Sequence, residues 1–125
     1  MTGNYSIYGN ELSPYSVKIR SYFRYKEIEH EWIERNLKNK KAFSKLAKIQ
    51  IIPLVHCPDG EVLQDSTPII LKMEEKFKNK LVVPKNPVLA FLSRLVEEYS
   101  DEWVVKHMCH YRWHYEENLD AAGKR

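Results

Sequence analysis

The sequence predicts an α/β fold in which a small mixed sheet, built in the order βαβαββα, precedes one or two long α-helices. Three observations lead to this class. Short runs of β-branched and aromatic residues alternate with stretches of helical periodicity up to about residue 78. An Asp-Gly pair at positions 59 and 60 separates two apolar runs, as in a β-hairpin. Residues 88–119 then contain neither proline nor glycine, which favours continuous helix.

The first half of the sheet domain begins with the run "YSIY" (5–8), which predicts a strand because it is short and rich in β-branched and aromatic residues. A helical pattern follows from Pro14, a residue that suits the first turn of a helix. The run "EHEWIER" (29–35) alternates weakly and indicates a second strand. The run "KNKKAFSKLAKI" (38–49) has the spacing of a short basic amphipathic helix.

The second half of this domain contains the hairpin, with the runs "IPLVHC" and "EVLQ" on either side of Asp59-Gly60. Pro53 stands at the front of the first run, where a proline suits the start or the edge of a strand. The run "STPIILKMEEKF" (66–77) predicts a helix with Ser66 as its N-cap and Pro68 in its first turn. A small sheet with helices on its faces is therefore complete before the connector.

The C-terminal part is predicted to be a connector followed by helix. Residues 79–87 carry two prolines, as a linking segment does. Residues 88–119 are predicted to form one long helix or two stacked helices, and Gly123 provides a helix-stop signal. We therefore expect two domains, residues 1–80 and residues 81–125.

Composition places the chain among globular proteins, with 43% hydrophobic and 30% charged residues. No apolar run approaches the roughly 18 residues of a membrane span, and the first residues do not have the pattern of a signal peptide. Two cysteines, Cys57 and Cys109, form neither a disulfide framework nor a C-x-x-C site. We expect a cytoplasmic protein with no membrane association, and Cys109 in a core.

The positive charge is concentrated in one part of the chain. Residues 17–48 carry ten Lys or Arg and four Glu, whereas the whole chain has a formal charge of +3. A basic segment suits a small anionic ligand or a nucleic-acid backbone, and most of these lysines fit solvated helix faces. The segment has no nucleic-acid recognition motif, so a nucleic-acid partner is not expected.

Three motifs occur together in order: "SPYS" at the start of the first helix, "QIIPLV" before the third strand, and "LQDSTPIILKMEEKF" at the last helix of the sheet. In this arrangement the chain resembles the glutathione transferase superfamily, in which a thioredoxin-like N-terminal domain precedes an all-helical domain. The Ser-Pro pair is most similar to the serine-type members. The resemblance covers residues 4 to about 118, so the helical domain is only partly represented.

The resemblance implies a glutathione site. It assigns Ser13 the catalytic hydroxyl, which would donate to the sulfur of glutathione. Ile52 would pair through its backbone with the cysteinyl part of glutathione, next to a cis Ile52–Pro53 bond. Asp65 and Ser66 would hold the γ-glutamyl end, and Lys40 or Lys41 the glycyl carboxylate. The family more often has Glu at the position of Asp65, whose side chain is one methylene shorter.

Other groups offer alternatives to these roles. Ser16 and, less favourably, Tyr8 are alternative donors to the sulfur. A dithiol oxidoreductase is excluded because the "SPYS" loop has no cysteine. His107, His110 and His114 share one predicted helix face, but a metal site needs further ligands in suitable geometry, and no metal is expected.

Two functions remain open at this point. The first is a glutathione transferase that binds glutathione as co-substrate and activates its thiol for conjugation to a small electrophile. The second is a non-catalytic module that keeps the fold for dimerisation or as a scaffold. The aromatic-rich C-terminal helix would expose a large apolar surface if it stood alone, so we expect a homodimer that buries it.

Overall fold

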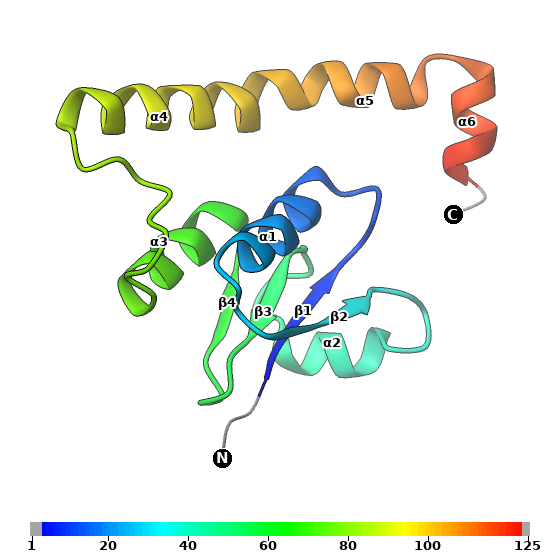
Figure 1. The fold of residues 1–125 in the computed structure, drawn as a ribbon. Helices are drawn as coiled ribbons and strands as arrows, with labels where there is room; N and C mark the ends of the chain where they lie inside the picture. Colours follow the sequence, from blue (N-terminus) through cyan, green and yellow to red (C-terminus); the bar gives the residue numbers. More distant parts are fainter. Residues whose placement is uncertain (1–3, 124–125) are drawn as a thin grey trace. The chain divides into compact units, whose positions relative to one another are not determined.

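The structure is a computed structural model and describes residues 4–123 of the 125-residue chain. Its element order is βαβαββα followed by further helices, so the predicted thioredoxin-like fold class is confirmed (Figure 1). The chain divides into two compact units, with the boundary between Val82 and Val83. Each unit is described separately below.

The first unit contains a four-stranded mixed sheet in the order β2-β1-β3-β4. The strands are β1 (Tyr5–Gly9), β2 (His30–Glu34), β3 (Leu54–His56) and β4 (Val62–Gln64). β1 runs parallel to β2 and antiparallel to β3, and β3 pairs antiparallel with β4 through the predicted hairpin. At its turn Gly60 has φ of +87°, a conformation that glycine adopts without a steric penalty.

Three helices cover this sheet: α1 (Pro14–Tyr25), α2 (Lys40–Leu46) and α3 (Ser66–Lys76). Successive strand residues point to opposite faces, and the β1 side chains follow this rule. Ile7 joins the buried cluster formed with residues of α1 and α3, whereas the neighbouring Tyr8 contacts Phe43 of α2, with ring centroids 5.8 Å apart. α1 and α3 therefore cover one face of the sheet, and α2 covers the other.

Two boundaries differ from the sequence prediction. The basic helix expected over 38–49 is shorter, Lys40–Leu46, because Ala47 already has extended backbone angles. The N-cap of α3 is Asp65 rather than Ser66, which is the first helical residue. The prediction took Ser66 because serine is a good capping residue, but the turn from β4 places Asp65 at the cap, with φ of 72°.

A buried polar network joins the end of α1 to α3. Lys26 and Glu74 form an ion pair at 2.8 Å, and Tyr22 Oη donates to the same Glu74 oxygen at 2.7 Å. Lys26 Nζ also donates to the backbone carbonyls of Phe77 and Asn79 in the connector. Both charges are satisfied by several partners, as buried charges need to be.

The second unit contains α4 (Pro87–Tyr99), the π-helical turn η1 (Ser100–Val104), α5 (Val105–Trp113) and α6 (Glu116–Gly123). α4, η1 and α5 follow one another without a gap, and α6 begins after a break at residues 114 and 115. Asn86 caps α4 by accepting from the N–H groups of Val88 and Leu89. Of the two predicted alternatives, the structure has one long helical segment and then a short separate helix.

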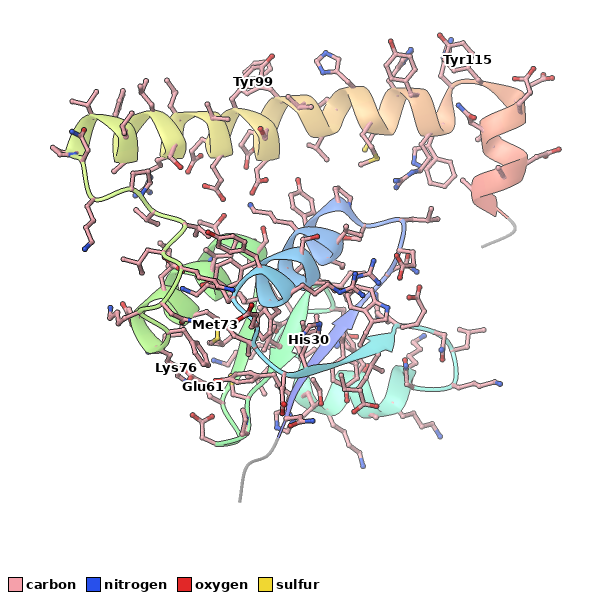
Figure 2. The ribbon with its side chains drawn as sticks, viewed as in Figure 1. His30, Glu61, Met73, Lys76, Tyr99 and Tyr115 are labelled. Atoms are coloured by element: carbon pink, nitrogen blue, oxygen red, sulfur yellow. The ribbon has the colours of Figure 1, made fainter. Side chains whose placement is uncertain are left out.

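None of the residues in these four helices is buried. Cys109, which we expected in a core, is exposed, because it lies on α5 and this helix buries no face within its unit. The prediction for Cys109 was wrong. Tyr99 and Tyr115 stand out from this helical segment (Figure 2). Among the residues that the structure describes, no helix is both long enough and apolar enough to cross a membrane.

Candidate functional site

Ser13 is the N-cap of α1, with extended backbone angles (φ −91°, ψ 113°). Its Oγ accepts a hydrogen bond of 3.2 Å from the backbone N–H of Ser16. A hydroxyl that accepts through a lone pair still has its own hydrogen to donate. Ser13 is half-buried, so it remains accessible to a ligand. Capping the helix and donating to a bound group are therefore compatible roles for this side chain.

The two alternative hydroxyls lie elsewhere. Ser16 is fully buried, and its Oγ has no hydrogen-bond partner among the described residues. It faces β1, because a Cβ added at Gly9 would lie 2.9 Å from Ser16 Cβ. Tyr8 packs against Phe43 on the α2 face of the sheet, away from α1. Of the three candidate hydroxyls, Ser13 combines a place at the start of α1 with access from outside.

The Ile52–Pro53 peptide bond is cis, as the resemblance implied. Pro53 is fully buried, and β3 begins at the next residue, Leu54. Ile52 is half-buried and lies outside the registered pairs of the β1–β3 ladder. Its backbone groups therefore take no part in the pairing of β1 with β3.

Gln64, the last residue of β4, holds the loop in front of Pro53, and sequence reasoning missed it. Its Oε1 accepts from the N–H groups of Lys48 and Ile49, at 2.8 and 3.2 Å. Its Nε2 donates to the carbonyls of Ile49 and Ile51, at 2.7 and 3.2 Å. One side chain therefore joins the loop before Ile52 to the end of β4. Nothing local in the sequence marks this role.

Asp65 and Ser66 stand at the start of α3, where unpaired backbone N–H groups favour negative charge. Asp65 is exposed and makes no side-chain hydrogen bond to cap the helix. Its φ of 72° is unusual for a residue with a Cβ, and such a conformation costs about 1–3 kcal/mol. Ser66 is fully buried, and its Oγ accepts from Lys18 Nζ at 3.4 Å.

Lys40 and Lys41 are the first two residues of α2, and both are exposed. In the part of the chain that the structure describes, neither lysine contacts Ser13 or Ser66, so the structure does not choose between them. Lys18, which the sequence did not single out, contacts the predicted site residue Ser66. The sequence could have pointed to Lys18 only through its position, five residues after Ser13.

A group of possible metal ligands lies at the other end of the hairpin. Cys57 Sγ and the carboxylates of Asp59 and Glu61 lie within 4.8 Å of one another. Lys76 Nζ already pairs with both carboxylates, at 3.1 Å each, and Figure 2 shows Glu61 beside Lys76. Burial raises the pKa of the Cys57 thiol to about 11, which disfavours the thiolate that a metal needs. We interpret this group as ion pairs between the hairpin and Lys76, and not as a metal site.

The three histidines of the second unit do not share one contact group in the structure. His110 and His114 stack on each other, with ring centroids 4.5 Å apart and planes 22° apart. His110 and His114 also contact Tyr115 edge to face. These rings form an aromatic cluster on α5 and the residues that follow it.

A sequence model of the glutathione S-transferase N-terminal domain matches residues 12–76, which is more than half of the chain. The match contains Ser13, the cis Ile52–Pro53 bond and the start of α3. The chain therefore belongs to the glutathione S-transferase family.

Among curated proteins, glutathione S-transferase U6 of Arabidopsis thaliana is 29% identical over 97 residues, which cover 74% of this chain and 42% of that protein. Among solved structures, the Tau class transferase of mango, Mangifera indica, is similar with a TM-score of 0.74 and 22% identity. That comparison covers 97% of this chain and 56% of the mango protein. The Omega 3C transferase of Trametes versicolor gives a TM-score of 0.77 at 15% identity, over 93% of this chain and 53% of that one. This chain thus spans about half the length of these relatives.

Proposed function

We propose that this protein binds glutathione and activates its thiol for conjugation to an electrophile. The observation that carries the proposal is Ser13, a half-buried hydroxyl at the N-terminal cap of α1 that keeps a hydrogen to donate. Membership of the family supports it. Transferases from Methylobacillus flagellatus and Sulfitobacter, which share the fold, have been crystallised with bound glutathione.

The chemistry needed is stabilisation of a thiolate. A free thiol with a pKa of about 8.5 is only about 3% ionised at pH 7. A charge-assisted hydrogen bond from Ser13, worth roughly 1.5–3 kcal/mol, would lower that pKa by about two units. The positive end of the α1 dipole acts in the same direction.

Ionisation alone contributes little to the rate. A drop of two pKa units raises the thiolate fraction about 25-fold, but each thiolate becomes about 8-fold less nucleophilic at a Brønsted slope near 0.45. The net gain is about 3-fold. Most of the acceleration must therefore come from holding the electrophile against the sulfur.

In this proposal, each of the remaining candidate residues binds one part of glutathione. The backbone of Ile52, beside Pro53, pairs with the cysteinyl unit as an added strand does. Asp65 receives the γ-glutamyl ammonium, and Ser66 the carboxylate at the start of α3. Lys40 or Lys41 takes the glycyl carboxylate. Residues 1–80 are the glutathione-binding domain and residues 81–125 a partial helical domain.

Ser13→Ala tests the proposal directly. We expect the thiol pKa of bound glutathione, measured from thiolate absorbance in the ultraviolet, to rise by about two units, and conjugation of a general electrophile to fall. Loss of the cap would also cost about 1 kcal/mol of stability. Ser13→Asp separates the two roles, because aspartate is as good a cap but donates no hydrogen bond when ionised.

Ser21→Ala is the matched control, since Ser21 is exposed on the same helix. It should leave the thiol pKa and conjugation as in the wild type. A wild-type protein that fails to bind glutathione would overturn the proposal. So would an unchanged thiol pKa in both Ser13 variants.

A second candidate function, a non-catalytic dimerisation or scaffold module, is favoured by the second unit. α4 leaves large apolar side chains exposed, among them Val88, Phe91 and Val96 at 63–66%. We propose that a second copy of the chain covers this surface and that the protein is a cytoplasmic homodimer. A stable dimer in sedimentation that neither binds glutathione nor conjugates an electrophile would favour this function over the first.

A further inference from the structure

We propose that Asn10 is a positioning residue for the Ser13 hydroxyl, and that its hydrogen bond to Glu34 fixes the place of this hydroxyl relative to the sheet. This inference rests on the proposed function, because Asn10 would act on glutathione only through Ser13. Asn10 follows β1 directly, and Glu34 is the last residue of β2. Gly9 and Glu34 are partners in the parallel ladder, so the chain leaves the sheet beside Glu34.

Asn10 shapes the turn that leads into α1. Its carbonyl oxygen accepts from the backbone N–H of Ser13 at 3.0 Å, which closes a turn over residues 10–13. Its Oδ1 accepts from the backbone N–H of Leu12 at 2.8 Å, as asparagine side chains often do in turns. Two hydrogen bonds to one residue therefore set the backbone at the cap of α1.

The amide nitrogen of the same side chain connects this turn to the sheet. Asn10 Nδ2 donates to Glu34 Oε1 at 2.8 Å, and both residues are half-buried. An amide has one accepting end and one donating end, so donation to Glu34 leaves Oδ1 facing Leu12. The second oxygen of Glu34 accepts from Trp32 Nε1 at 3.2 Å, which holds the carboxylate in place. The orientation of Asn10 is thus set by a residue of β2.

Arg20 of α1 holds the other side of the turn. Its guanidinium donates to both carboxylate oxygens of Glu11 and lies over the Trp32 ring, 4.3 Å from the ring centroid. The turn is therefore joined to α1 through Glu11 and to β2 through Asn10. Because Glu11 is exposed, its ion pair contributes less than a half-buried bond to a fixed carboxylate. The bond between Asn10 and Glu34 therefore carries the proposal.

The exact place of the Ser13 hydroxyl matters because a hydrogen bond weakens steeply when its length or angle departs from the favoured geometry. On the helix side, Ser13 Oγ is held by the N–H that Ser16 donates. On the strand side, it is held by the turn that Asn10 shapes. Loss of the bond to Glu34 should therefore weaken the contact between Ser13 and the sulfur and leave the contacts made by other elements intact.

An exchange of groups across the Asn10–Glu34 bond tests the proposal. Asn10→Asp keeps an acceptor for Leu12 but places a carboxylate against that of Glu34. We expect the thiol pKa of bound glutathione, measured from thiolate absorbance, to rise by about one unit, half the effect of losing the Ser13 bond. The double variant with Asn10→Asp and Glu34→Gln restores a hydrogen bond of opposite direction, because the new amide donates to the new carboxylate. Its thiol pKa should return to the wild-type value.

S-methylglutathione separates a positioning role from a general structural one. It carries the groups of the tripeptide but has no thiol to ionise. Titration calorimetry of the full chain should give a Kd for this ligand within about 3-fold of wild type in each variant. In a Ser13→Ala background, Asn10→Asp should raise the thiol pKa of bound glutathione no further. A direct repulsion of the thiolate by the added charge would persist in that background.

Two further variants control for charge and for folding. Asn36→Asp is the same substitution in an exposed turn after β2, where Asn36 accepts from the N–H groups of Lys38 and Asn39. It should leave the thiol pKa unchanged. Asn10→Ser adds no charge and keeps an acceptor for the turn, but it loses the amide that donates to Glu34. It should raise the thiol pKa as well, and it replaces Asn10→Asp if that variant does not fold.

Each outcome decides something. An unchanged thiol pKa in Asn10→Asp would overturn the positioning role, and so would a rise that the exchange does not reverse or that persists without Ser13. A Kd for S-methylglutathione beyond the expected range would overturn it too, since the whole site is then disturbed. The proposed function stands in these cases, because Ser13→Ala tests it separately. A wild-type protein that does not bind glutathione would overturn both. A reversible rise that needs Ser13, with S-methylglutathione still bound, supports the inference.

Discussion

Gly9, the last residue of β1, shows how closely α1 approaches the sheet beneath Ser13. An added Cβ would lie 2.3 Å from Trp32 Cη2 and 2.9 Å from Ser16 Cβ. Real Cβ atoms do not approach other atoms so closely, so a larger residue must displace either the indole or α1. The glycine is required here for space, not for its backbone angles.

Gly9→Ala is expected to lower the free energy of unfolding by about 2 kcal/mol, the usual cost of overpacking. Because Ser16 donates to Ser13 Oγ, a shift of α1 should also disturb the hydroxyl at the cap. Denaturant titration with urea measures the loss. Gly123→Ala, where the structure leaves open space around the added Cβ, is the control and should cost nothing. Equal stability of the two variants would contradict the close approach.

At the scale of elements, Gln64 is the tie between β4 and the loop that leads into β3. Its four hydrogen bonds to the loop backbone replace the pairing that a regular strand would have provided. Each such hydrogen bond contributes about 0.5–1.5 kcal/mol to the stability of the folded state. The loop before Ile52 therefore owes its conformation to a residue distant in sequence.

Gln64→Leu keeps the side-chain volume and removes all four bonds. We expect faster hydrogen exchange at the amides of Lys48 and Ile49, and a several-fold weaker affinity for glutathione with little change in kcat, since Ser13 is untouched. Gln50→Leu is the matched control, because Gln50 accepts from the side chain of Ser44 at an exposed position. If exchange at Ile49 stays as slow as in wild type, Gln64 does not hold the loop.

At the scale of the whole molecule, the first unit is held together by charge as well as by its apolar core. Burial by itself would raise the pKa of Glu74, but hydrogen bonds from Lys26, Tyr22 and the N–H of Val82 outweigh it and lower that pKa below its usual 4.5. The same contacts raise the pKa of Tyr22, where burial is the largest cause and Glu74 adds to it.

The sign of the pH dependence follows from this shift. A carboxyl whose pKa is lower in the folded state stabilises the protein above its unfolded pKa and loses that contribution as the pH falls through the folded value. We expect the free energy of unfolding to decline below about pH 4.5. Glu74→Gln should lower stability at pH 7 by on the order of 3 kcal/mol, because the buried Lys26 ammonium loses its counter-charge.

The Glu74→Gln protein should also lose part of the acid dependence seen in wild type, when unfolding is followed by circular dichroism from pH 7 to pH 3. Glu75→Gln is the control on the next residue, which is exposed and paired with Lys72 at 3.7 Å. It should change stability by less than about 0.5 kcal/mol. If the Glu74→Gln protein is as stable as wild type at pH 7, the polar network contributes nothing to the free energy of unfolding.

Much of the fold was predictable because its signals are local. Pro14 after Ser13 marked the start of α1, and Asp59-Gly60 marked the hairpin, since each depends on backbone angles that a few adjacent residues set. Errors arose at boundaries, as at Asp65, where the turn from the preceding strand decided the cap. Cys109 was misplaced because hydrophobic character alone does not say whether a helix has a neighbour to pack against.

The sequence by itself determined the order of the elements and the position of Ser13 at a helix start, because these follow from periodicity and turn chemistry along a short stretch of chain. The family was indicated by the resemblance of three motifs in order. Only the tertiary structure decided which hydroxyl is accessible, and that Lys18 reaches Ser66, Gln64 holds the loop and Lys26 pairs with Glu74. Such contacts join residues far apart in sequence, and they depend on which face of each strand and helix turns toward the next element.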